Sequence, residues 1–164
     1  MNELGVVLML WLLPLHLHPV SAGGGAMIGP VDAISETVVL QEITDGLRIR
    51  LEITERVQVV LVNHNPLVMS VETLGGRAGP FVITVDRDFI SDLGDDEIEA
   101  ALAHELGHVW IYTHHPYVQT ERLANEIAMR VISRSAFEPV YEKVWRRTGI
   151  RGNLVEFIGP GSQH

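Results

Sequence analysis

Residues 94–108 read GDDEIEAALAHELGH, and the rest of this 164-residue chain can be interpreted outward from them. The acidic start suits a helix N-terminus, where carboxylates face the positive end of the helix dipole. The pattern predicts a helix from about Asp96 to Thr113. His104 and His108 are four positions apart, so a helix places both imidazoles on one face, one turn apart. Two imidazoles at this spacing can bind one zinc ion.

Glu105 follows the first histidine and completes an HExxH pattern. On a helix its carboxylate lies at the edge of the histidine face, where it can reach a water on the metal without binding the metal itself. That position predicts a general base. Gly107 costs a helix about 1 kcal/mol relative to alanine, and a need for a small residue beside the metal offers a reason for it. The alternative is a surface helix that happens to carry two histidines.

A catalytic zinc site needs a third protein ligand and leaves the fourth position to water. Pro116 ends the first helix, and a second helix is predicted over residues 119–134. If that helix folds back, its first turn approaches the metal. Glu121 and Asn125 then share a face, so Glu121 can bind zinc while Asn125 hydrogen-bonds a zinc-bound histidine. Against this, Glu121 could simply be an exposed carboxylate at a helix start.

His114 is the competing third ligand. The spacing from His104 to His114 fits the metzincin pattern of zinc proteases, which has a glycine at the position of Ile111. A β-branched isoleucine is poorly suited to the left-handed backbone of such a sharp break. We therefore favour Glu121 and keep His114 as the alternative.

The stretch 94–108 resembles the active-site helix of the CAAX-prenyl-protease/HtpX-like family of gluzincin zinc metallopeptidases. Residues 121–125, ERLAN, resemble that family's Glu-x-x-Ala-Asp third-ligand motif, with Asn125 in place of the aspartate. Residues 81–85, FVITV, resemble a strand of its sheet, whose edge strand binds substrate. The likeness covers roughly residues 35–135 and lacks the membrane helices of the larger members.

The resemblance also implies a histidine or tyrosine that stabilises the oxyanion formed during peptide hydrolysis. His115 and Tyr117 lie at the predicted helix break and are the candidates. Each could equally be a loop or packing residue. No residue suggests a site for an organic cofactor.

The fold class predicted is α+β and zincin-like. A small mixed or antiparallel sheet packs against the HExxH helix and the following third-ligand helix. Hydrophobic spacing also predicts a helix over 33–45 stopped by Gly46, strands over 47–53, 57–62, 67–74 and 81–85, and a helix near 137–147.

The N-terminus predicts a targeting segment. Residues 4–15 are almost purely aliphatic, but twelve helical residues span only about 18 Å, too short for a bilayer core of about 30 Å. Small residues precede a glycine run, so residues 1–22 are predicted as a signal peptide; an uncleaved anchor and a buried helix are the alternatives. Residues 23–32 would then be a Gly-rich linker, 33–148 the metallopeptidase domain and 149–164 a C-terminal tail.

Composition narrows the function further. A net charge of −9 counts against nucleic-acid binding, which needs clustered Lys and Arg. The absence of cysteine excludes disulfides, thiolate metal sites and a cysteine nucleophile. The sequence therefore predicts a single-zinc endopeptidase acting on peptides or proteins. We expect it to be secreted or periplasmic, or anchored outside the cytoplasm if residues 4–15 remain in a membrane. A non-catalytic zinc-binding or chaperone-like module on the same fold is the alternative.

Overall fold

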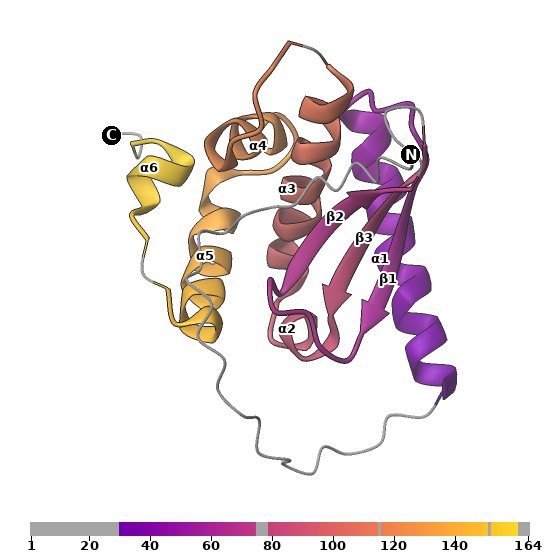
Figure 1. The fold of residues 1–164 in the computed structure, drawn as a ribbon. Coiled ribbons are helices and arrows are strands. Elements are labelled where there is room, and N and C mark those ends of the chain that lie inside the picture. Colours follow the sequence, from indigo (N-terminus) through magenta and orange to yellow (C-terminus); the bar gives the residue numbers. More distant parts are fainter. Residues whose placement is uncertain (1–29, 75–78, 115, 151, 161–164) are drawn as a thin grey trace, which may run out of the picture.

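The structure is a computed structural model that describes residues 30–74, 79–114, 116–150 and 152–160, with side chains from Ser35 onward. The predicted signal peptide and residues 23–29 of the predicted linker lie outside this part. Within the described residues, nine elements follow one another (Figure 1): α1 Pro30–Arg50, β1 Val57–Val62, β2 Met69–Thr73, β3 Phe81–Asp86, α2 Arg87–Ser91, α3 Asp95–Thr113, α4 Glu121–Ala128, α5 Arg134–Thr148 and α6 Leu154–Ile158. Among these described helices, none is long and apolar enough to cross a bilayer.

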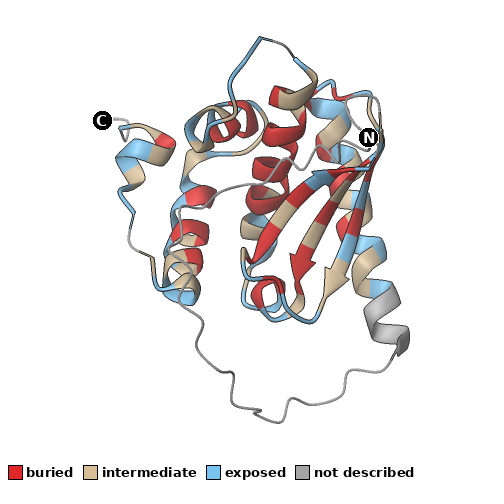
Figure 2. Cartoon of the chain, viewed as in Figure 1, coloured by how far each residue is buried: buried red, intermediate tan, exposed pale blue. Residues whose placement is uncertain are grey.

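The three strands form one mixed sheet in the order β1-β3-β2. β3 pairs parallel with β1 and antiparallel with β2. Buried and more exposed residues alternate along β1 and β2 (Figure 2), as expected for a sheet with one face in the core. Val59, Ile83 and Val71 lie in register on the buried face. The predicted α+β fold with a small mixed or antiparallel sheet is confirmed, and the sheet is of the mixed kind.

Helices α1 and α3 contact each other and pack against the sheet, α1 along β1 and α3 beside β2. The side chain of Gln41 on α1 also bonds the backbone of β1. Its Nε2 donates to the carbonyl of Val57 at 3.0 Å, and its Oε1 accepts from the amide of Val59 at 2.9 Å. This pairing covers part of the β1 edge, so the two sheet edges are not equivalent.

The predicted strand over residues 47–53 is wrong, because α1 continues through Gly46 to Arg50. Leu47 and Leu51 are buried, but Ile49 between them is 69% exposed. The apolar residues that face the core are therefore four apart, a helical spacing, and the alternation that suggested a strand is coincidental. Gly46 is an exposed residue inside the helix rather than its stop.

Further differences lie after the HExxH helix. The predicted helix over 119–134 is shorter: α4 ends at Ala128, and a turn leads to α5, which begins at Arg134, earlier than predicted. Two short helices, α2 and α6, were not predicted. α6 lies in the segment assigned to the C-terminal tail, and it contacts α4 and α5.

Candidate metal centre

The central element of the site is α3, which is buried along most of its length against the sheet, α1, α4 and α5. Its first turn is fixed by Glu97, whose carboxylate accepts a hydrogen bond from the Gly94 amide at 2.6 Å and pairs with Lys143 of α5. Burial raises the pKa of Glu97, but the hydrogen bonds from Lys143 and the Gly94 amide, together with the charge of Lys143, outweigh burial and lower it. The acidic start of the helix thus also ties α3 to α5.

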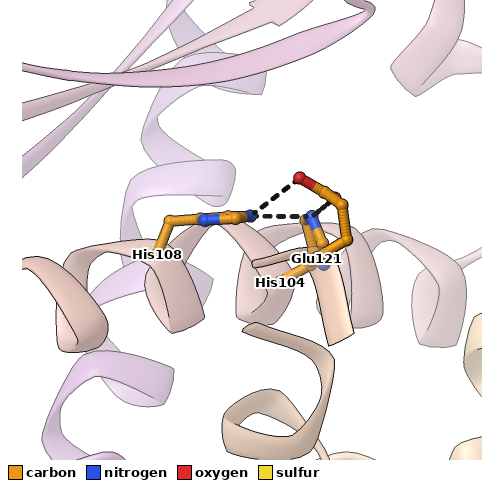
Figure 3. A group of neighbouring side chains, drawn as sticks. All are labelled: His104, His108 and Glu121. Atoms are coloured by element: carbon orange, nitrogen blue, oxygen red, sulfur yellow. Dashed lines mark hydrogen bonds and ion pairs between the residues drawn. The ribbon is translucent and has the colours of Figure 1, made fainter. Parts of the chain in front are cut away.

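Three side chains from two helices converge at one point (Figure 3). The Nε2 atoms of His104 and His108 lie 3.3 Å apart. The Glu121 carboxylate, from the first turn of α4, approaches them at 3.2 Å and 3.7 Å respectively. The three ligand atoms all lie within 4.8 Å of one another, so this group could bind a metal ion. The structure thus brings together the three residues that the sequence predicts as ligands.

An amide side chain contacts each histidine at Nδ1, the ring nitrogen that faces away from the other candidate ligands. Asn125 Oδ1 lies 2.7 Å from Nδ1 of His104, and Gln119 Oε1 lies 2.9 Å from Nδ1 of His108. Gln119 also donates from its Nε2 to the carbonyl of His108 at 3.0 Å. A carbonyl only accepts, so the other end of this amide must be the oxygen, and His108 Nδ1 carries the proton that it accepts. The Nε2 of His108 is then left with its lone pair toward the site.

Gly107 has a packing role that differs from the one predicted. A Cβ at this position would lie 2.3 Å from the carbonyl oxygen of Ala124 and 2.9 Å from its Cα. The backbone of α4 therefore lies directly against α3 where α3 has no side chain. The glycine permits the close approach of the two helices that carry the ligands, rather than making room for the metal.

Charges at the site depend on one another. Burial lowers the pKa of His104, but its hydrogen bond and Coulombic attraction to Glu121 outweigh this and raise it to about 8. Burial, assisted by repulsion from His104, lowers the pKa of His108 to about 4. For Glu121, burial is outweighed by the hydrogen bond to His104 and by both histidines, so its pKa is lowered. Without a metal, these shifts favour a protonated His104 paired with an ionised Glu121.

The donor set fits a divalent metal such as zinc. Two imidazole nitrogens and a carboxylate converge, and protonation of His104 is what balances the carboxylate charge in the absence of a metal. A group of this kind is stabilised when a metal ion replaces the proton. Two nitrogen atoms and one oxygen atom, with no fourth candidate ligand in the described part of the chain, would leave one position of a tetrahedral metal site open to water.

Glu105 lies beside this group and is not part of it. Its side chain is buried, and its Oε2 has no hydrogen-bond partner. Burial raises the pKa of Glu105 to about 7, although attraction to His104 opposes the shift. A buried carboxylate oxygen without a partner is costly in a folded protein, and it indicates a group kept for a water or a substrate.

The remaining predicted site residues lie elsewhere. His114 stacks on Trp110 with ring centroids 3.9 Å apart, and its Nδ1 lies 2.8 Å from the Trp110 carbonyl oxygen. It does not belong to the ligand group, so the structure brings Glu121 and not His114 to the histidines. Tyr117 is exposed and tilted against Trp110 at 5.5 Å. His115 lies outside the described residues. Gln119 was not predicted, because a single polar residue before a helix carries no distinguishing pattern.

An apolar pocket opens beside the ligand group. The start of β2, helix α3 and helix α5 line it, with His104 and Glu105 at one side and Met69, Phe137 and Val140 among its apolar residues. The three candidate ligands, His104, His108 and Glu121, therefore form a polar centre that borders an apolar pocket.

Comparison with known proteins identifies no family. No family model matches the chain, and no curated protein matches it. Among solved structures, the chain is similar to the crystal structure of the metallopeptidase zymogen of Pyrococcus abyssi abylysin. The TM-score is 0.49 and the identity 15%, over 67% of this chain and 95% of that chain. Similarity at this level assigns neither the prenyl-protease family nor an activity to this chain.

Proposed function

We propose that this protein is a zinc-dependent endopeptidase. One observation carries the proposal: His104, His108 and Glu121 converge within 4.8 Å beside the buried and unpartnered carboxylate oxygen of Glu105. A protein that only stores or senses a metal has no need for that fourth group. Hydrolysis by an activated water requires it, because a base must take the proton of the water as it attacks.

In the proposed reaction, zinc, when bound, polarises the attacking water and the scissile carbonyl. His104, His108 and Glu121 hold the ion, and Asn125 and Gln119 orient the two imidazoles. Glu105 accepts the proton of the water and then transfers it to the leaving nitrogen of the peptide. A base whose pKa is raised toward 7 is suited to both steps near neutral pH.

The substrate would bind as an extended peptide next to β2. Gln41 already bonds part of the β1 edge, whereas β2 is the other edge of the sheet and lies next to α3. A peptide added to this edge would gain backbone hydrogen bonds. One of its smaller side chains could then enter the narrow apolar pocket beside Glu105.

The test compares two glutamate variants of the same helix. Glu105→Gln is expected to bind zinc like the wild type and to lose peptidase activity by about 10²- to 10⁴-fold. The matched control is Glu99→Gln, since Glu99 lies on α3 beside a groove toward α1 and away from the ligand group. Zinc content is measured by atomic emission, and hydrolysis with a mixture of quenched fluorescent peptides.

Two outcomes would contradict the proposal. Full activity of Glu105→Gln would remove the carboxylate from the reaction. A wild-type protein that binds one zinc ion but hydrolyses none of the peptides would instead favour the non-catalytic zinc-binding module. Glu121→Ala distinguishes this proposal from a metzincin-type protease. The variant should lose tight zinc binding if Glu121 is the third ligand and keep it nearly intact if His114 is.

A further inference from the structure

The C-terminal helix α6 is anchored close to the metal centre. The ring of Phe157 packs against Tyr141 and Trp145 of α5, with centroids 5.3 Å and 6.2 Å apart. Arg134 donates to the carbonyl of Ile158, whose side chain is buried. These contacts fix the main chain at Phe157, although α6 is only five residues long.

The main-chain carbonyl of Phe157 reaches the ligand group through one side chain. Asn125 Nδ2 donates to this carbonyl at 3.0 Å and to the hydroxyl oxygen of Tyr141 at 2.6 Å. The Oδ1 of the same amide lies 2.7 Å from Nδ1 of His104. Asn125 is fully buried, and protein groups satisfy both ends of its amide. This one side chain links α6 to the candidate ligand His104.

The donors and acceptors in these hydrogen bonds fix the orientation of the Asn125 amide. A carbonyl only accepts hydrogen bonds, so the end of the Asn125 amide that faces Phe157 must be the nitrogen. The oxygen of the Asn125 amide therefore faces His104, and the Nδ1 of His104 must carry the proton that it donates to this oxygen. In the metal-bound form, where the imidazole is neutral, the lone pair of His104 is then confined to Nε2, the atom that faces His108 and Glu121.

We propose that α6 is a positioning element of the metal centre: the Phe157 carbonyl orients the Asn125 amide, which fixes the tautomer and direction of His104. The proposal rests on the proposed function only in that His104 binds the metal. It also explains why an amide occupies position 125. An aspartate could accept from His104 but could not donate to the Phe157 carbonyl, and its oxygen would lie against the carbonyl oxygen.

The experiment measures zinc dissociation constants of the full chain by competition with a chromophoric chelator. Phe157→Ala removes the ring that anchors the carbonyl and is expected to weaken zinc binding about tenfold, in the range seen when partners of metal ligands are removed. Asn125→Ala is expected to weaken it by about 10- to 100-fold. The matched control is Val155→Ala on the same helix, whose side chain is 52% exposed; it should change the constant less than about twofold.

A double mutant separates positioning from general destabilisation. If α6 acts through Asn125, Phe157→Ala should have almost no further effect on zinc affinity in the Asn125→Ala background. The visible spectrum of the Co²⁺-loaded protein should change in Phe157→Ala and not in Val155→Ala. If Phe157→Ala fails to fold, Arg134→Met loosens the same helix more gently through Ile158 and should weaken zinc binding about threefold, at the lower end of such effects.

The proposal is overturned if Phe157→Ala leaves zinc affinity unchanged in a folded protein, or if its effect multiplies with that of Asn125→Ala. These outcomes do not depend on hydrolysis. A protein that binds zinc in an α6-dependent way but cleaves no peptide would overturn only the endopeptidase. A wild type that binds no zinc would overturn both.

Discussion

Helices α3 and α4 both supply residues of the candidate metal centre, but different contacts hold the two helices in place. α3 is 19 residues long, and the sheet, α1, α4 and α5 surround it. α4 has eight residues, too few for an isolated helix to be stable in water. Its place depends on contact with α3 at Gly107 and on α6 behind it. The histidine pair is thus set by the geometry of one helix, whereas Glu121 is set by packing between segments.

The largest effect is expected where the two helices touch. Gly107→Ala places a methyl group 2.3 Å from the Ala124 carbonyl oxygen, which must push α4 and Glu121 away. We expect a loss of about 3 kcal/mol in the free energy of unfolding and a loss of tight zinc binding. The control is Gly46→Ala in α1, where a Cβ meets nothing within 4 Å; it should stabilise the protein by about 0.5–1 kcal/mol. Urea denaturation measures both, and equal responses would refute the close-contact role of Gly107.

The next effect concerns the support behind α4. Asn125→Asp keeps an acceptor for His104 but removes the hydrogen bond that Asn125 donates to the part-buried Phe157 carbonyl. We expect a destabilisation of about 1.5 kcal/mol, the upper end of the value of one lost hydrogen bond, together with faster proteolysis near the C-terminus. Thermal unfolding and limited proteolysis test this. A variant as stable and as resistant as the wild type would show that a carboxylate serves equally well here.

A smaller loss of zinc affinity is expected from a substitution in the loop that leads into α4. Gln119→Ala removes the acceptor for His108 Nδ1, but this site is only partly buried, so water can replace the amide. We expect zinc affinity to fall about tenfold, less than for Asn125→Ala. Gln58→Ala, on the exposed side of β1, is the control. Isothermal titration with zinc decides the order, and a larger loss for Gln119 than for Asn125 would reverse the comparison.

The smallest effect lies at the start of α3. The pKa of Glu97 is lowered in the folded protein from its ordinary 4.5, so its stabilising contribution is present above pH 4.5 and is lost as the pH falls through the folded value. Glu97→Gln should cost about 0.5–1 kcal/mol at pH 7, the range for a partly buried ion pair and helix cap. The difference from wild type should shrink toward zero as the pH falls below 4. Urea denaturation at several pH values measures it, and a difference independent of pH would exclude the charge of Glu97 as its source.

The spacing of apolar residues predicted those helices and strands in which the spacing is regular over several residues. The three strands and α3 occur close to their predicted bounds. A strand or helix with one buried face has apolar residues at a regular spacing, and that spacing is visible in the sequence. The same rule failed over residues 47–53, where apolar and polar residues alternate but the buried leucines are four apart. The short helices α2 and α6 carry too few residues to show a period at all.

The sequence by itself determined the two histidines, Glu105 between them and the helix that presents them, because a spacing of four on one helix needs no information from elsewhere in the chain. The sequence favoured Glu121 over His114 but left both open, and tertiary structure brought Glu121 to the histidines. It also gave Gly107 its contact with Ala124, and it joined the Phe157 carbonyl to His104 through Asn125. These are contacts between separate segments, and they exist only once burial of a shared core has packed α3, α4 and α6 together.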